Sequence, residues 1–283
     1  MSVWMVSCAV GSLRDLEAAL DHFSFVDIAV HSMKLSLGIA ANESTDRLVD
    51  MLVPFRARIS SVHMQNNYTS QAKDGAPLLK QDLTLMSALD IRIGVLHLRP
   101  PVDTKDLEDQ LQLVCSLASG SEAKIAIENL PDRRNRAQGF AWIRNPVSIS
   151  EYLEANEWPC IELCLDTSHA LCRNLRRWNT PAVRKHVVAI HLSDGIPGQD
   201  AHLALGPGTN QCMLKETSNL IESSDQDGVV ILENRDVSEA IKSLQYLLHI
   251  GVCSGDGVWR HQRREGDRAC TSSDFGWAHG SQL

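Results

Sequence analysis

The sequence predicts an α/β fold, a single (β/α)8 TIM barrel followed by a polar C-terminal tail. Three observations lead to this prediction. Eight short apolar runs alternate with eight amphipathic stretches over about 250 residues. The runs are continuous rather than alternating, as is typical of parallel strands buried on both faces. No glycine-rich phosphate loop follows the first run, which argues against the structural alternative, a nucleotide-binding open sheet.

The expected strands are short, apolar and rich in β-branched residues, which suit a buried, pleated surface. VWMVSCAV and VVAIHL are the clearest cases. In chain order the expected strands are Val3–Val10, Val26–Val30, Ile59–Met64, Ile93–Leu98, Lys124–Asn129, Ile161–Asp166, Val187–Leu192 and Val229–Glu233.

Each expected strand is followed by a stretch with helical periodicity. Asn42 or Ser44 is expected to cap the second helix, because its side-chain oxygen can accept a hydrogen bond from a free backbone N–H. The expected helices are Gly11–Phe23, Asn42–Phe55, Leu79–Leu89, Thr104–Ala118, Ser148–Asn156, Pro181–His186, Met213–Ser223 and Val237–Ile250. Residues 1–250 therefore form the predicted barrel. Residues 251–283 are polar, rich in Gly and Ser and without a period, so we expect a poorly ordered tail.

The composition limits the classes of function. A formal net charge of -8 gives no overall attraction to nucleic acid, although a local basic patch can still bind it. The eight cysteines form no CxxC pair, and the N-terminus lacks the basic start and apolar run of a signal peptide. No run approaches the ~20 apolar residues of a membrane span. We expect a cytoplasmic protein with free thiols and no membrane contact.

Potential metal ligands stand at the ends of six successive expected strands or in the loops just beyond them. In a barrel these C-terminal strand ends converge, so residues far apart in sequence would meet. A single histidine or carboxylate at a strand end could simply hydrogen-bond to the backbone. Many buried imidazoles and carboxylates together would repel one another or shift their pKa values unless a cation lay between them. Such side chains bind zinc, manganese and iron. The nine candidates are His63, His97, Glu128, Asp166, His169, His191, Asp200, His202 and Glu233, with Asp200 and His202 expected in a loop.

Arginines follow two of the same strand ends. Arg99 comes after the fourth expected strand, and Arg133 and Arg134 come after the fifth. Guanidinium groups bind phosphate oxygens in a bidentate manner, so these three are candidate phosphate-binding residues. The alternative is a solvated loop with surface ion pairs.

Five segments carry a resemblance to known proteins: IAIENL, CLDTSHAL, VVAIHLSD, DAHLALGPG and VVILEN. Together they resemble the xylose-isomerase-like TIM barrels, and within them endonuclease IV, the zinc-dependent apurinic/apyrimidinic endonucleases. The resemblance implies up to three zinc ions. It assigns His63, His97 and Glu128 to the first ion, Glu128, Asp166, His191 and Glu233 to the second, and His169, Asp200 and His202 to the third.

Three functions follow as expectations. The first is a metal-dependent phosphodiester hydrolase that cleaves DNA at abasic sites. The second is a sugar or sugar-phosphate isomerase or epimerase, using zinc, manganese or another divalent metal, in which Glu128 and Glu233 exchange protons with a substrate carbon. The third is a non-catalytic metal-binding scaffold. Glu128 and Glu233 are the expected catalytic residues, the expected partner is DNA with an abasic site or a phosphorylated sugar, and no protein partner can be inferred.

Overall fold

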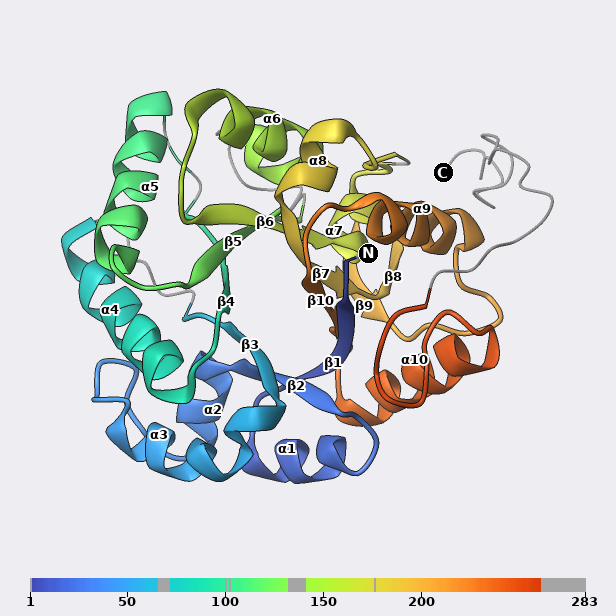
Figure 1. The fold of residues 1–283 in the computed structure, drawn as a ribbon, viewed down its shortest axis with the longest axis horizontal. Coiled ribbons are helices and arrows are strands. Elements are labelled where there is room, and N and C mark those ends of the chain that lie inside the picture. The colour runs from blue at the N-terminus through green and yellow to red at the C-terminus, as the bar shows by residue number, and fades with distance from the viewer. Residues whose placement is uncertain are drawn as a thin grey trace, which may run out of the picture.

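The computed structural model describes residues 2–65, 72–99, 101, 103–131, 141–175 and 177–260. Eight parallel strands close into a barrel in the order β1-β10-β7-β6-β5-β4-β3-β2, with the helices outside (Figure 1). The predicted (β/α)8 barrel is therefore confirmed. The barrel strands are β1 Trp4–Val10, β2 Phe25–Ala29, β3 Ile59–His63, β4 Ile93–Leu96, β5 Lys124–Glu128, β6 Ile161–Asp166, β7 Val187–Leu192 and β10 Gly228–Leu232.

Most helices of the outer ring begin at a side chain that accepts a hydrogen bond from the first turn. Ser12, Asp103 and Asp236 each cap a helix in this way. The helices are α1 Leu13–Leu20, α2 Val30–Ser36, α3 Asp46–Leu52, α4 Ala72–Leu89, α5 Thr104–Ala118, α6 Pro146–Asn156, α7 Thr167–Cys172, α8 Pro181–His186, α9 Gln211–Ser223 and α10 Val237–His249, with 3-10 turns η1 Val53–Arg58 and η2 Ala141–Arg144.

Three features of the fold differ from the sequence prediction. The second predicted helix stops at Leu52 and continues as the 3-10 turn η1, which contains Pro54. Helices α2 and α7 were not predicted. An antiparallel hairpin, β8 Asp194–Ile196 with β9 Gln199–Leu203, stands beside the barrel where a loop was expected.

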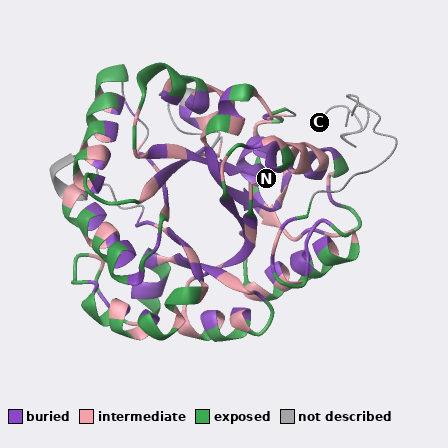
Figure 2. Ribbon diagram, viewed as in Figure 1, coloured by how far each residue is buried: buried purple, intermediate pink, exposed green. Residues whose placement is uncertain are grey.

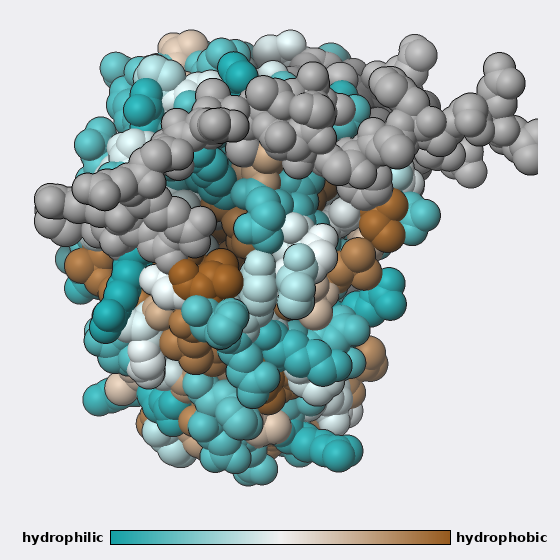
Figure 3. All heavy atoms as spheres, turned by 90° about the vertical axis from the view of Figure 1, so that its right-hand side faces the viewer, coloured by the Kyte–Doolittle hydropathy of each residue, from teal (hydrophilic) through white to brown (hydrophobic). Residues whose placement is uncertain are grey.

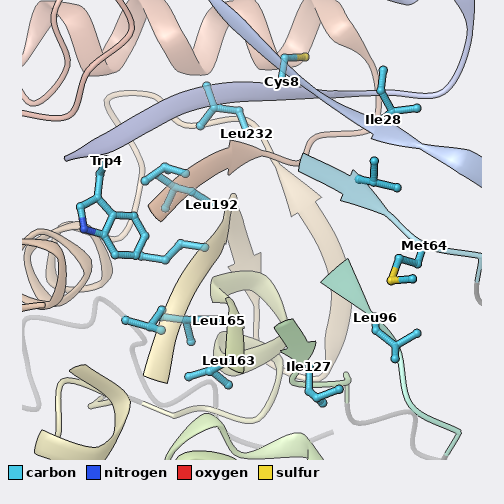
Figure 4. Close-up of a cluster of buried hydrophobic side chains, with 14 of the residues drawn as sticks. Trp4, Cys8, Ile28, Met64, Leu96, Ile127, Leu163, Leu165, Leu192 and Leu232 are labelled. Carbon is cyan, nitrogen blue, oxygen red and sulfur yellow. The ribbon is translucent and has the colours of Figure 1, made fainter. Parts of the chain in front are cut away.

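The main core lies between the barrel and the helices. Leu96, Ile127, Leu165 and Leu232 are among the strand side chains in this layer (Figure 4). A second, smaller apolar cluster includes Ala126 and Ile231, which alternate along their strands with residues of the main core. Burial is accordingly concentrated in the strands and on the inner sides of the helices (Figure 2).

One face of the molecule is largely polar. On the side shown in Figure 3, hydrophilic residues predominate and hydrophobic ones form small groups between them. Within the described part of the chain, no helix has the length and apolar character that crossing a membrane requires.

Residues 251–260 form a closing segment that packs on β1. The tail prediction fails for this segment. Val6 N–H donates to the Gly257 carbonyl at 2.7 Å, and Trp259 N–H donates to the Trp4 carbonyl at 2.8 Å. Strand β1 pairs with β2 only from Ser7 onward, so its first residues have backbone groups to share. Trp259, only 4% exposed, adds the apolar anchor that the polar composition concealed. The rest of the predicted tail, residues 261–283, lies outside the described residues.

Candidate metal centre

The structure brings all nine predicted ligands together at the C-terminal end of the barrel. His63, Glu128 and Asp166 are the last residues of β3, β5 and β6, and His97 and Glu233 directly follow β4 and β10. Parallel strands that end at one rim place these side chains around a common centre.

The first group joins His63 and His97 to Glu128. His97 Nε2 lies 2.8 Å and His63 Nε2 4.0 Å from Glu128 Oε2. The two imidazole rings meet edge to face, with centroids 4.8 Å apart. One potential ligand atom from each of the three residues lies within 4.8 Å of the others.

The second group has four members and is centred on His191. Its Nδ1 lies 2.7 Å from Glu233 Oε2 and 3.1 Å from Glu128 Oε2. Asp166 Oδ2 is 3.9 Å from the same nitrogen. The four ligand atoms again fall within 4.8 Å of one another. Glu128 belongs to both groups and would bridge two ions.

The third group is built on hairpin β8–β9, where we had expected a loop. Asp200 Oδ1 lies 2.9 Å from His202 Nε2 and 3.2 Å from His169 Nε2. His202 has a φ of 43°, in the left-handed region that non-glycine residues rarely occupy. Its N–H donates to Ser168 Oγ at 3.2 Å, which helps hold the strained residue in place.

Buried polar atoms without hydrogen bonds show that the residues fit a cation. Buried nitrogen and oxygen atoms are normally satisfied, because leaving one unpaired costs free energy. Single exceptions occur at several places among the described residues, but eight of them gather in this cluster. The eight are His63 Nε2, His97 Nε2, both carboxylate oxygens of Glu128, Asp166 Oδ2, both ring nitrogens of His191 and Glu233 Oε2. Imidazole nitrogen and carboxylate oxygen are the donors that zinc and manganese accept.

The protonation equilibria of the site are strongly displaced. Burial, followed by the neighbouring His97, lowers the pKa of His63 to about 4, so this imidazole is neutral and able to bind a metal. Burial raises the pKa of Asp166 to about 6. Burial alone would also raise the pKa of Glu128, but His97 and His191 hold it well below its usual range.

Two asparagines support the ligands, and the sequence analysis missed both. Asn129 follows Glu128, accepts the Asp166 N–H at 2.8 Å and donates to the Asp166 carbonyl at 3.0 Å. Asn234 follows Glu233 and donates to the Leu203 carbonyl at 3.0 Å, which ties β9 to the barrel. The Glu-Asn pair found at the C-terminal end of both β5 and β10 was the signal available in the sequence.

Of the three predicted phosphate-binding arginines, Arg99 alone lies within the described residues. The Arg99 guanidinium pairs with Asp106 on α5, within its own strand–helix unit. Arg133 and Arg134 lie outside the described residues. Phosphate binding by these three residues stays a prediction.

Fold and site together define a (β/α)8 barrel with a polar ligand cluster at the C-terminal end of its strands. The profile of one protein family, the xylose isomerase-like TIM barrel, matches residues 12–249. The chain belongs to this family. No curated protein matches the sequence.

Several solved structures share the fold at low sequence identity. A D-tagatose 3-epimerase-like protein has a TM-score of 0.65 and 17% identity over 87% of this chain and 96% of its own. A D-allulose 3-epimerase from Methylomonas sp. has a TM-score of 0.59 and 13% identity over 88% and 98%. A xylose isomerase domain protein from Alicyclobacillus acidocaldarius subsp. acidocaldarius has a TM-score of 0.61 and 16% identity over 87% and 97%. At these identities the likeness establishes the fold alone.

Proposed function

We propose that the chain is a metal-dependent sugar isomerase or epimerase. One observation carries the proposal: Glu128 and Glu233, from β5 and β10, approach the same nitrogen of His191, at 3.1 and 2.7 Å. Two carboxylates that face one centre from separate strands can serve the two faces of a substrate carbon. The family and the epimerases among the structures of similar fold are consistent with this chemistry.

The exposure of the ligands indicates where a substrate binds. The side chains of His97, Asp200 and Glu233 are 24%, 29% and 24% exposed, whereas that of Glu128 is 1% exposed. A sugar therefore enters on the side that His97, Asp200 and Glu233 share. A divalent ion held by Glu128, Asp166, His191 and Glu233 would polarise the substrate oxygens and acidify the adjacent C–H.

The proton transfer belongs to the glutamates. Burial alone would raise the pKa of Glu233, but His191 holds it far below its usual range, so the residue is ionised at neutral pH. The Glu233 carboxylate accepts the proton from the substrate carbon. Return of a proton to the opposite face inverts that carbon, and its return to the neighbouring carbon isomerises the sugar. Glu128 is placed to assist from the inner side.

A solvent-exchange experiment tests this proposal. Metal-loaded protein and a ketose are incubated in D2O, and deuterium in the sugar is followed by mass spectrometry. Exchange is expected with the wild type and not with Glu233→Gln. Glu157→Gln, which changes an exposed residue at the end of α6, is the matched control and should exchange at the wild-type rate. An absence of exchange across a panel of ketoses and their phosphates would refute the proposal.

A second candidate is a phosphodiester hydrolase that cleaves DNA at abasic sites. It is favoured by the presence of His63, His97 and Asp200 in the cluster, which exceed what one ion needs. A hydroxide positioned between ions is the usual nucleophile in such enzymes. This candidate requires more than one metal per chain and nicking of an abasic duplex that a chelator abolishes.

His97→Ala separates the two candidates. His97 belongs only to the first group, so its loss would remove an outer ion from a hydrolase and most of the nicking activity. An isomerase that uses the four-membered group should keep activity within about tenfold, because no ligand of that ion changes. Metal content per chain, measured on both proteins purified without chelator, provides the independent readout.

A further inference from the structure

Two thiols lie against each other on the outside of the barrel, away from the metal centre. Cys160 Sγ is 2.9 Å from Cys115 Sγ, and neither cysteine is in a disulfide. Cys115 lies near the end of α5, and Cys160 stands just before the first residue of β6. Asp166, the metal-site residue of β6, is at the other end of that strand.

We propose that Cys115 and Cys160 form an oxidation site, which a small-molecule disulfide converts to an intramolecular disulfide bond. A disulfide has an S–S length of about 2.05 Å, so the sulfurs need approach by only roughly 0.9 Å. Both residues are partly exposed, so a small reagent has access to them.

The backbone around the two cysteines limits the rearrangement that closure needs. The Cys160 carbonyl accepts the Ile125 N–H at 2.8 Å, which holds it against the start of β5. Cys115 is held in α5, whose neighbouring residues Leu111, Val114 and Ala118 are buried against the core. Because both backbones are held and the sulfurs touch, the second cysteine should attack the mixed disulfide faster than a second molecule of reagent reacts.

The reaction consists of two exchanges. In the first, one cysteine loses its proton and attacks the reagent RSSR, forming a mixed disulfide and releasing RS⁻. In the second, the other cysteine loses its proton and attacks the sulfur of the mixed disulfide. The protein S–S bond forms and the second RS⁻ leaves. The two protons end on the two RSH molecules, and the protein loses two electrons to the reagent.

The rate of oxidation is expected to be low at neutral pH and higher in alkali. Burial, followed by the adjacent Cys115 thiol, raises the pKa of Cys160 to about 12, and thiolate is the attacking species. The exchange in which Cys160 is the attacking group is therefore the slow one. The rate should rise between pH 7 and pH 9.

The bond would stabilise the protein without altering the metal centre. It would close a loop over residues 116–159, which contains β5 and α6, and so restrict the unfolded chain. An increase in the unfolding midpoint of roughly 5–10 °C is expected for a chain of this length. Zinc affinity should be unchanged, since the nine candidate ligands do not include either cysteine.

The test is oxidation of the full chain with glutathione disulfide at pH 8.5, followed by intact mass and peptide mapping. We expect a mass loss of about 2 Da, a linked pair of peptides carrying Cys115 and Cys160, and the higher unfolding midpoint. The midpoint should return to its starting value after reduction.

Variants distinguish this pair from general thiol oxidation. Cys115→Ser and Cys160→Ser should each remove the linked peptides and the stabilisation, and Cys115→Ala serves if the serine variant fails to fold by circular dichroism. Cys253→Ser, at a buried thiol bonded to the Ser254 carbonyl, is the control and should oxidise as the wild type does. Stable glutathione adducts, linkage to another cysteine, or no reaction would each overturn the proposal.

Discussion

Strand β6 carries a carboxylate at each end, and the two have opposite surroundings. At the N-terminal end, Glu162 accepts hydrogen bonds from His186 Nδ1 at 3.1 Å and Gln226 Nε2 at 3.3 Å. At the C-terminal end, Asp166 Oδ2 is buried and has no hydrogen bond. The residue types are similar at the two ends. The Glu162 carboxylate is hydrogen-bonded within the protein, whereas Asp166 has an unpaired buried oxygen that could bind a cation.

The strongest way to test this contrast is Glu128→Gln, because Glu128 belongs to both the first and the second group of ligands. An amide cannot supply the anionic ligand. Affinity for zinc should fall by more than the roughly 10–100-fold that is typical of changes outside the ligand set. Competition with a chelating dye measures this effect, with circular dichroism to verify the fold. Wild-type affinity in this variant would remove Glu128 from the centre.

The opposite end is tested by Trp259→Ala, which removes the anchor of the closing segment. The ring is 4% exposed, and truncation of a buried Trp typically costs about 3–5 kcal/mol. Urea unfolding should show a loss in this range. Zinc affinity, measured well below the unfolding midpoint, should match the wild type. A loss below about 1 kcal/mol would mean that the segment contributes little to the barrel.

The release of a proton when a metal binds is a further test of the C-terminal end of the barrel. Burial alone would lower the pKa of His202, but Asp200 and Asp166 raise it to about 9. The imidazole is thus protonated at pH 7.5 and must lose that proton to bind a cation. Calorimetric titration with zinc in buffers of different ionisation enthalpy should detect the released proton, and His202→Ala should release fewer.

The same shift makes the stability of the metal-free protein depend on pH. The folded pKa of about 9 exceeds the ordinary value of 6.5, so the stabilisation by His202 is complete below pH 6.5. It is lost as the pH rises through 9. The unfolding midpoint of chelator-treated protein should therefore fall over this interval, and should fall less in His202→Ala.

The smallest effect is expected for Glu162→Gln at the N-terminal end. The glutamine keeps one carbonyl acceptor and loses the second acceptor oxygen and the charge shared with Lys124, which lies 3.6 Å away. Partly exposed ion pairs contribute below about 1 kcal/mol. Urea unfolding should show a change of that size, with no change in zinc affinity. A marked loss of metal binding would contradict the separation of the two ends.

The barrel could be predicted because each of its strands is an apolar run long enough to recognise. Strands β6 and β7 have the predicted bounds. Helix α2 could not be predicted, because tertiary contacts hold it. Its Lys34 Nζ donates to the Ala41 carbonyl at 3.0 Å, the Glu43 carbonyl at 2.7 Å and Gln81 Oε1 at 2.9 Å. No local sequence pattern predicts a buried lysine whose hydrogen-bond partners lie in a following loop and in another helix.

The candidate ligands could be predicted because they stand where strands end, but the support around them could not. Strand β9 reads QDAHL, which has no apolar period. Its order depends on Ser168 and Asn234, residues far away in the sequence. From the sequence, Glu128, Asp166, His191 and Glu233 could be assigned to one ion only by resemblance to a known family. The distances between them depend on the register of β5, β6, β7 and β10.

The closing segment has a consequence for the closure of the barrel. A barrel is a ring, and its seam lies where the first and last strands, β1 and β10, run side by side. Here Trp4 and Trp259 are joined by a backbone hydrogen bond across that seam, on the first residues of β1. The pairing of β1 with β10 closes the ring, and the segment after α10 fastens it a second time.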